Sequence, residues 1–219
     1  MNNAAFFDID GTLIKCYSQN ILMKNLFARH VLNAGQVFRI SMWFMLYRFG
    51  LVVGSSRLRR ACYVVFSRRS REEIDSIFIK TVNDILSWYK RKEMEKIVAG
   101  HNSKKDYLFA ISSSLAQMCI PIANAFGIKN VFSTELKMVN GYYTGAWRGE
   151  LLEGNEKAYL IKKLAQQYAI DLSSSSAYAD SCSDLPMLEI VGNPVAVDPD
   201  PQLKKIACKR KWQIILPYV

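Results

Sequence analysis

Four carboxylates, one hydroxyl and one ammonium are placed along the sequence where they could meet in a single reactive site. Three of the aspartates and the serine each come at the end of an apolar run typical of a buried strand, and the lysine begins a segment with helical periodicity. So many carboxylates would repel one another unless a hard cation lay among them, and Mg²⁺ prefers oxygen ligands. The six residues are Asp8, Asp10, Ser112, Lys157, Asp180 and Asp184.

The strands that would position these residues alternate with helices. Strands separated by helices favour a mostly parallel sheet covered on both faces. Ligands of such sheets bind beyond the carboxyl ends of the strands. Asn140-Gly141 predicts a hairpin turn between two further strands, at 136–139 and 142–144. The other expected strands are 4–9, 107–111, 131–132, 176–179, 194–197 and 212–216. The expected helices are 115–125, which follows the serine run and has Gly127 as its stop, 155–168 and 201–210.

Between the first and second of these strands the pattern is entirely helical. Ser70-Arg71-Glu72-Glu73 predicts a capping box, in which Ser70 accepts from the Glu73 amide and Glu73 reaches back. We therefore expect a core formed by residues 1–14 and 100–219, with a helical subdomain, residues 15–99, inserted into it. The candidate helices of the insertion are 20–32, 36–49, 56–67, 70–90 and 91–99.

The residue types suit phosphoryl transfer, whose transition state spreads charge over three oxygens and is stabilised by positioned cations and donors. Asp8 and Asp10 are separated by one residue, so on an extended strand they point the same way. One carboxylate could then face phosphorus while the other serves the leaving oxygen. Gly11 permits a sharp turn after them, and the Thr12 hydroxyl could bond back to steady the loop.

The segment Phe6-Phe7-Asp8-Ile9-Asp10-Gly11-Thr12-Leu13 resembles the DxDGT signature of the haloacid dehalogenase (HAD) superfamily. Ser112 resembles its second motif, Lys157 its third, and Asp180-Ser181-Cys182-Ser183-Asp184 its fourth, in the DxxxD form. The stretch from Thr134 to Lys157 is similar to subfamily IB, the phosphoserine-phosphatase-like group. The resemblance covers essentially the whole chain, and it implies an α/β fold: a Rossmann-like parallel sheet core (the HAD fold) with an inserted all-helical cap of the C1 type.

The resemblance also implies a function, that of a Mg²⁺-dependent phosphatase which hydrolyses a phosphomonoester through an aspartyl-phosphate. Asp8 would be the nucleophile, and Asp10 would protonate the leaving alcohol and later activate water, touching the metal through its carbonyl oxygen rather than its carboxylate. Lys157 would balance the charge on Asp8 and the phosphoryl group. The implied phosphate-binding residues are Ser112, Ser113, Gly11 and Thr12, and the implied metal ligands are Asp8, Asp10, Asp180 and Asp184.

Each signal alone also has an ordinary structural explanation. Asp10-Gly11 could be a simple turn, Ser112 a helix cap, Lys157 a solvated charge, and the pair Asp180 and Asp184 a helix N-terminus. All of them in this order favour a functional site. A phosphotransferase that uses an alcohol acceptor, and a phosphate-binding homologue without turnover, remain open alternatives.

The formal net charge of +10 is unevenly distributed. Residues 15–105 hold 18 Lys and Arg against 6 Asp and Glu, a net of +12, and the rest of the chain has a net of −2. A basic insertion indicates an anionic substrate or an anionic surface. Nucleic acid is disfavoured as a partner, because the basic residues are interleaved with apolar helical faces and no nucleic-acid-binding motif is present.

Two features of the insertion concern the substrate. Residues 38–54 are strongly apolar but contain Arg39 and Arg48, so they could lie in an anionic membrane interface or form the buried seam of the helical cap. The substrate could accordingly be a soluble phosphometabolite or a lipid phosphate of the phosphatidylglycerophosphate type, which some subfamily IB members hydrolyse. Phosphoserine phosphatases have glutamate nine residues after the nucleophile; Tyr17 stands there in this chain, so we do not assign phosphoserine.

Composition indicates the cellular compartment of the protein. No run of 18 apolar residues is present, and the first ten residues lack the basic region of a signal peptide. The 5 cysteines match neither a disulfide framework nor a zinc site. We expect a cytoplasmic protein, peripheral at the inner membrane face if the insertion binds lipid.

Overall fold

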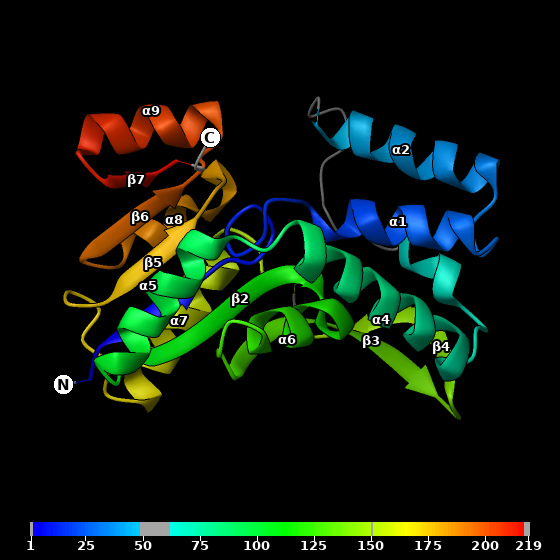
Figure 1. Ribbon diagram of the computed structural model, residues 1–219, viewed down its shortest axis with the longest axis horizontal. Helices are drawn as coiled ribbons and strands as arrows, with labels where there is room; N and C mark the ends of the chain where they lie inside the picture. Colours follow the sequence, from blue (N-terminus) through cyan, green and yellow to red (C-terminus); the bar gives the residue numbers. More distant parts are fainter. Residues whose placement is uncertain (1, 49–61, 150, 217–219) are drawn as a thin grey trace.

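The computed structural model describes residues 2–48, 62–149 and 151–216, and it describes side chains up to Met42 and again from Cys62 (Figure 1). Its strands are β1 (Ala4–Phe7), β2 (Tyr107–Leu115), β3 (Asn130–Val139), β4 (Tyr142–Arg148), β5 (Ser176–Ala179), β6 (Asn193–Val197) and β7 (Gln213–Ile215). They form one sheet in the order β4-β3-β2-β1-β5-β6-β7. Neighbouring strands are parallel except β3 and β4, which are antiparallel. The expected α/β fold with a mostly parallel sheet is confirmed.

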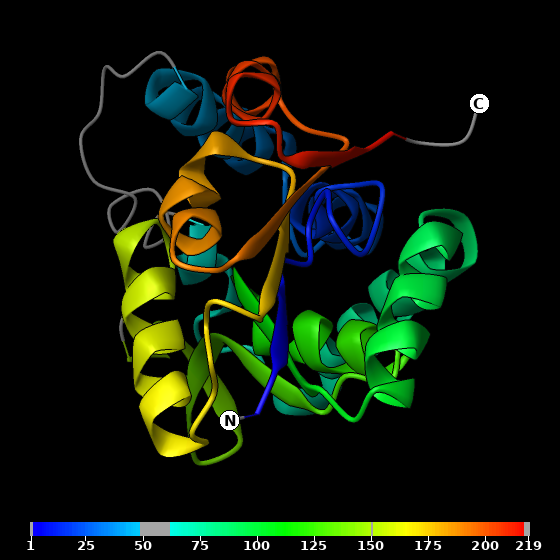
Figure 2. The ribbon, with the colours of Figure 1, turned by 90° about the vertical axis from the view of Figure 1, so that its left-hand side faces the viewer.

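Helices cover both faces of this sheet. They are α1 (Ser18–Ala28), α2 (Ala34–Arg48), α4 (Arg71–Trp88), α5 (Lys92–Ser103), α6 (Ala116–Asn124), α7 (Asn155–Gln167), α8 (Leu185–Glu189) and α9 (Pro201–Arg210), with 3₁₀ turns η1 (Val64–Phe66) and η2 (Cys182–Asp184). Because side chains alternate along a strand, Ala5 and Phe7 of β1 pack with α1, α4, α5 and α6, whereas Ala4 and Phe6 pack with α7, α8 and α9. Figure 2 shows α7 and α5 on opposite sides of β1.

In the described part of the segment between β1 and β2, helices joined by turns are present and no strand, as the periodicity predicts. In Figure 1, α2 lies over α1, and α4 extends beneath α1 toward β3 and α6. The next helix, α5, contacts β2. The predicted boundary between residues 99 and 100 falls inside α5, and the division into core and inserted cap stays a prediction.

The apolar stretch 38–54 is described only in part. Its first residues belong to α2, which ends at Arg48, and residues 49–54 lie outside the described residues. Of the helix expected over 56–67, only the part from residue 62 onward is described, and it includes η1. Among the residues that the structure describes, no helix is long and apolar enough to cross a membrane.

Three local predictions need correction. The strand expected to end at Ile111 continues through the serines to Leu115, which pairs with Thr134. The pairing of β2 with β3 is irregular between Ile111 and Leu115, and within this stretch the Thr134 hydroxyl donates to the carbonyl of Ser113 at 2.8 Å. The strand expected at 131–132 likewise extends to Val139.

The third correction concerns the capping box, of which half forms. The Ser70 Oγ accepts the Glu73 amide at 3.2 Å, as expected. The Glu73 carboxylate instead pairs with Arg69 Nη1 at 2.6 Å, because the neighbouring cation offers a charged partner. The hairpin at Asn140-Gly141 is confirmed, with both residues at positive φ (50° and 77°).

Candidate active site

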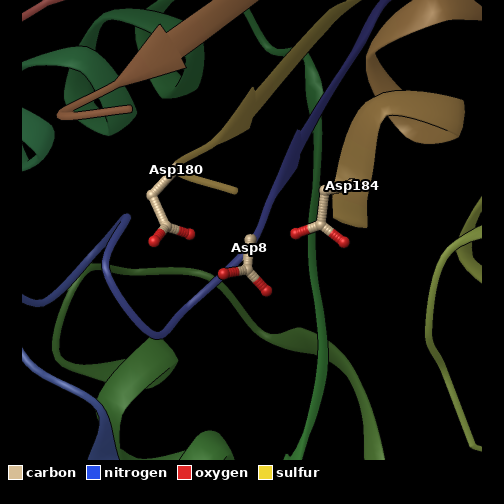
Figure 3. A group of neighbouring side chains, drawn as sticks. All are labelled: Asp8, Asp180 and Asp184. Atoms are coloured by element: carbon tan, nitrogen blue, oxygen red, sulfur yellow. The ribbon is translucent and has the colours of Figure 1, made fainter. Parts of the chain in front are cut away.

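Two neighbouring parallel strands carry the carboxylates. Asp8 directly follows β1 and Asp180 directly follows β5, and β1 pairs with β5 in parallel, so both side chains emerge at the same edge of the sheet. Asp184 joins them as the last residue of η2, directly before α8. Figure 3 shows the three carboxylates facing one another. One oxygen atom of each lies within 4.8 Å of the corresponding atoms of the other two. The structure thus brings these three predicted residues together.

Lys157 supplies the positive charge of this cluster. It lies in the first turn of α7, and its Nζ donates to Asp8 Oδ1 at 2.7 Å and to the Asp184 carboxylate at 2.8 Å. All three side chains are buried. The ammonium therefore holds two carboxylates that would otherwise repel each other.

Burial and charge shift the pKa values of these groups. Burial raises the pKa of the Asp8 carboxyl well above its usual range, against the lowering effect of Lys157. Burial, reinforced by the charge of Asp184, raises the pKa of Asp180 to about 7. For Lys157, burial alone would lower the pKa, but Asp184 and Asp8 outweigh it and hold the pKa above its usual value. One ammonium thus leaves the carboxylates incompletely neutralised.

The donor set fits a magnesium ion. Asp8, Asp180 and Asp184 offer hard oxygen atoms from three directions, at the spacing that a shared small cation needs. Burial and the neighbouring charge of Asp184 both disfavour the ionised form of Asp180 and raise its pKa. A divalent cation would supply opposing positive charge.

The Asp10 carboxylate lies outside this cluster. Its Oδ1 accepts the Ser18 amide at 2.7 Å, and its Oδ2 accepts the hydroxyls of Ser18, at 3.1 Å, and of Ser114. Burial raises the pKa of Asp10, and the bonds from Ser114 and Ser18 oppose the rise. The carboxylate is thus held between β2 and the first residue of α1, separate from the oxygen atoms that gather around Asp8.

The predicted phosphate-binding residues divide into two groups. Ser112 and Ser113 line the same cleft as the carboxylates, and Ser112 Oγ accepts the Ser114 amide at 3.1 Å. Gly11 and Thr12 lie in the loop beside the cleft rather than among its lining residues. The full lining is Asp8, Asp10, Tyr17, Gln19, Asn20, Ser112, Ser113, Ser114, Leu152, Glu153, Gly154, Lys157, Asp180, Ser181, Ser183 and Asp184.

The loop after Asp10 is steadied differently from the prediction. The Thr12 hydroxyl is buried and has no hydrogen-bond partner among the described residues, so it does not bond back. Backbone bonds hold the loop instead: the amides of Thr12, Leu13 and Ile14 donate to the carbonyl of Ile9, at 3.0 to 3.2 Å. Gly11 is required here because its φ is +78° and a β-carbon would collide with the Asp180 carboxylate.

Sequence reasoning missed several residues of the site. Ser18 and Ser114 hold Asp10, and the Tyr17 hydroxyl lies 3.5 Å from Asp180 Oδ2. Asp200 accepts the Cys182 amide at 2.8 Å and so anchors the segment between Asp180 and Asp184. Ser114 could have been noticed because it shares a face of β2 with Ser112; the others depend on contacts between distant parts of the chain.

The sequence matches a known family over most of its length. The model of haloacid dehalogenase-like hydrolases matches residues 5–189. The chain is 28% identical to phosphoserine phosphatase SerB1 of Mycobacterium tuberculosis over 221 residues, which cover 96% of this chain and 70% of that protein. It is also 28% identical to histidinol-phosphatase of Neisseria meningitidis serogroup C over 222 residues, which cover 98% of this chain and 99% of that protein.

Solved structures share the fold. A Bordetella pertussis Tohama I protein of unknown function aligns with a TM-score of 0.87 at 24% identity, over 98% of both chains. A phosphoserine phosphatase solved as a phospho-aspartyl intermediate analogue aligns with a TM-score of 0.72 at 19% identity, over 98% of this chain and 93% of that chain. At these identities the likeness establishes the fold alone.

Proposed function

We propose that this chain, which belongs to the haloacid dehalogenase-like hydrolase family, is a Mg²⁺-dependent phosphatase that hydrolyses a phosphomonoester through an aspartyl-phosphate on Asp8. One observation carries the proposal: the buried ammonium of Lys157 binds Asp8 and Asp184 at the strand ends where Asp180 also lies. With Asp8 as the nucleophile and these carboxylates as metal ligands, the arrangement would have the cations that phosphoryl transfer requires.

The reaction proceeds in two displacements. An Asp8 carboxylate oxygen attacks phosphorus, the ester P–O bond breaks, and the leaving oxygen takes a proton from Asp10. A water molecule then gives a proton to Asp10 and attacks the phosphorus of the aspartyl-phosphate. The Asp8–phosphorus bond breaks, which releases inorganic phosphate and restores the Asp8 carboxylate.

The other residues stabilise charge and hold the phosphoryl group. Lys157 offsets the charge of Asp8 and of the phosphoryl oxygens, and the Ser112 hydroxyl with the adjacent amide of Ser113 holds one of those oxygens. Asp8, Asp180 and Asp184, with the Asp10 carbonyl, would hold Mg²⁺, which supplies positive charge for the phosphoryl oxygens. Ser18 and Ser114 orient Asp10 for its proton transfers.

The substrate class is a phosphomonoester of an alcohol. The phosphoserine phosphatase and histidinol-phosphatase relatives support a soluble phosphometabolite. The surface of α2 supports a lipid phosphate: Phe38 is 70% exposed and lies one turn from the exposed Met42, beside the exposed Arg39. Apolar side chains beside a cation suit an anionic bilayer surface.

A phosphate-release screen tests the proposal. The chain is incubated with Mg²⁺ and p-nitrophenyl phosphate, then with a panel of phosphorylated amino alcohols and sugars and with liposomes that contain phosphatidylglycerophosphate. We expect release from at least one substrate, abolished by EDTA and restored by Mg²⁺. No release from any substrate with Mg²⁺ present would reject the phosphatase assignment. Sedimentation with the liposomes, tested at low and high salt, separates lipid attachment from a soluble substrate.

A further inference from the structure

We propose that Arg91 is a positioning residue, which with Asp198 holds the loop that carries Asp8 and Asp10 in register with the loop that carries Asp180. The proposal rests on the phosphatase function above, because turnover is one of its two readouts. Arg91 is only 1% exposed. Its Nη2 donates to the carbonyl of Gly11 at 3.0 Å and to Asp198 Oδ2 at 3.0 Å.

The contact of Arg91 with Gly11 holds the loop that carries Asp8 and Asp10. Gly11 directly follows Asp10, and its carbonyl is the acceptor of Arg91. The Arg91 amide also donates to the carbonyl of Leu13 at 3.1 Å. The side chain and the backbone of Arg91 thus both hold the turn that follows the two aspartates.

Arg91 lies between α4 and α5, where the chain returns to the start of the helical segment. The outgoing and returning segments meet there, because the Lys15 amide donates to the carbonyl of Tyr89 at 2.7 Å and Ile14 pairs with Lys90 in an isolated bridge. A movement of the insertion relative to the sheet would therefore pull on Arg91. Because Arg91 binds the carbonyl of Gly11, this movement would also displace the loop that carries Asp8 and Asp10.

The loop between β6 and α9 completes the connection. Its Asp198 binds Arg91, and two residues later Asp200 donates its amide to the carbonyl of Asp180 at 2.8 Å and accepts the Cys182 amide with its carboxylate. The loop of residues 198–200 thus contacts the loop that carries Asp180 directly, and it contacts the loop that carries Asp8 and Asp10 through Arg91. The position of residues 198–200 therefore sets the separation between those two loops.

Burying this guanidinium is expensive. Its Nε and Nη1 have no acceptor among the described residues, although both are inaccessible to solvent. A well-packed apolar side chain often stabilises a fold as well as or better than a buried ion pair. The buried guanidinium of Arg91 is therefore better explained by a role in positioning the loops that it binds than by a contribution to the stability of the fold.

The test compares two changes at Asp198 with a matched ion pair elsewhere. Asp198 has φ +44°, so Asp198→Gly removes the carboxylate without straining the left-handed backbone, and Asp198→Asn keeps an acceptor in place. Glu189→Gln is the control, because Glu189 forms a comparable pair with Arg210 at 2.6 Å on the surface. Arg91→Lys and Arg91→Met extend the series from the other partner.

We expect Asp198→Gly to lower kcat at least about tenfold with KM within about twofold, since small displacements of reacting groups are costly. Asp198→Asn should recover most of this loss, and Arg91→Lys should exceed Arg91→Met in activity. Rates are compared at a temperature where circular dichroism shows each variant folded. A folded Asp198→Gly protein with wild-type kcat overturns the proposal.

A second readout does not depend on turnover. The Mg²⁺ concentration for half-maximal thermal stabilisation should rise about tenfold in Asp198→Gly, because the contact between Arg91 and Asp198 sets the distance between Asp8 and Asp180. It should stay unchanged in Glu189→Gln. If the wild-type chain released no phosphate, the phosphatase function would fail, while this titration would still test the role of the Arg91–Asp198 contact. An unchanged Mg²⁺ requirement in Asp198→Gly contradicts it.

Discussion

The Nζ of Lys157 lies 2.7 Å from Oδ1 of Asp8, although 149 residues separate them in the sequence. The contact brings the third predicted motif onto the first, and it is buried from solvent on both sides. In this setting a charge has much stronger effects than in water. Lys157 therefore lowers the pKa of Asp8 against the effect of burial, and in the proposed mechanism it also supplies positive charge to the phosphoryl group.

Lys157→Met should lower kcat about 10²–10³-fold, because it removes a buried cation from the place where charge develops. The uncompensated carboxylates should also lower the melting temperature in EDTA, and Mg²⁺ should recover part of that loss. Lys163→Met on the exposed face of the same helix serves as control, since Lys163 contacts only the ring of Tyr159 among the contacts described for it. Comparable kcat values for Lys157→Met and Lys163→Met would remove Lys157 from the mechanism.

Gly11→Ala should abolish Mg²⁺-induced stabilisation and phosphate release, because its β-carbon would displace the Asp180 carboxylate. Gly141→Ala is the matched control: its φ of +77° is nearly that of Gly11, but nothing lies within 4 Å of the added carbon. Both variants pay about 1 kcal/mol for a left-handed backbone. Melting curves with and without Mg²⁺ separate the backbone strain, which both variants share, from the collision with Asp180, which only Gly11→Ala has. An equal rise in melting temperature with Mg²⁺ in the two variants would contradict the collision.

Ser114→Ala should reduce kcat about tenfold, a fraction of the roughly 10²–10⁴-fold that a positioned acid–base contributes. The Asp10 carboxylate would lose the Ser114 hydroxyl and keep only the amide and hydroxyl of Ser18. KM should change little, because binding of the phosphoryl group involves other residues. The control is Ser103→Ala, whose exposed hydroxyl donates to the carbonyl of Ala99, away from the carboxylates. A Ser114→Ala enzyme with unchanged kcat would show that Asp10 needs no such support.

The stabilisation by Mg²⁺ should depend on pH. The pKa of Asp180 is raised from 3.8 to about 7, so the metal-free folded state binds more protons than the unfolded state between these values, and its free energy of unfolding falls as pH rises. Mg²⁺ must displace this proton below about pH 7. The rise in melting temperature caused by Mg²⁺ should therefore be larger at pH 8 than at pH 6. Equal shifts at both values would contradict the coupling.

The sequence predicted well those elements that local pattern determines. The strand at 176–179 and the helix at 201–210 have the predicted bounds, and the start of the helix is marked locally by the Asp200 N-cap and by Pro201. The hairpin at Asn140-Gly141 follows from turn chemistry alone. The motif residues around Asp8 were found because strand ends of a parallel sheet converge on one edge.

The remainder depends on contacts between distant segments. β2 continues past the serine run to Leu115, which pairs with Thr134 of the neighbouring strand, and no local signal distinguishes this from a strand end. Arg91 was counted among the basic residues of the insertion, yet it is buried against Gly11 and Asp198. A residue's charge is visible in the sequence, but its partners are set by the tertiary fold.

The central claim is that Asp8 attacks phosphorus, and Asp8→Asn tests it most directly. The amide has nearly the same shape as the carboxylate but is a poor nucleophile, so circular dichroism should report an intact fold. Phosphate release from the best substrate of the screen, with Mg²⁺ present, should fall about 10⁴-fold or more. Release by a folded Asp8→Asn protein at the wild-type rate would contradict the assignment of Asp8 as the nucleophile.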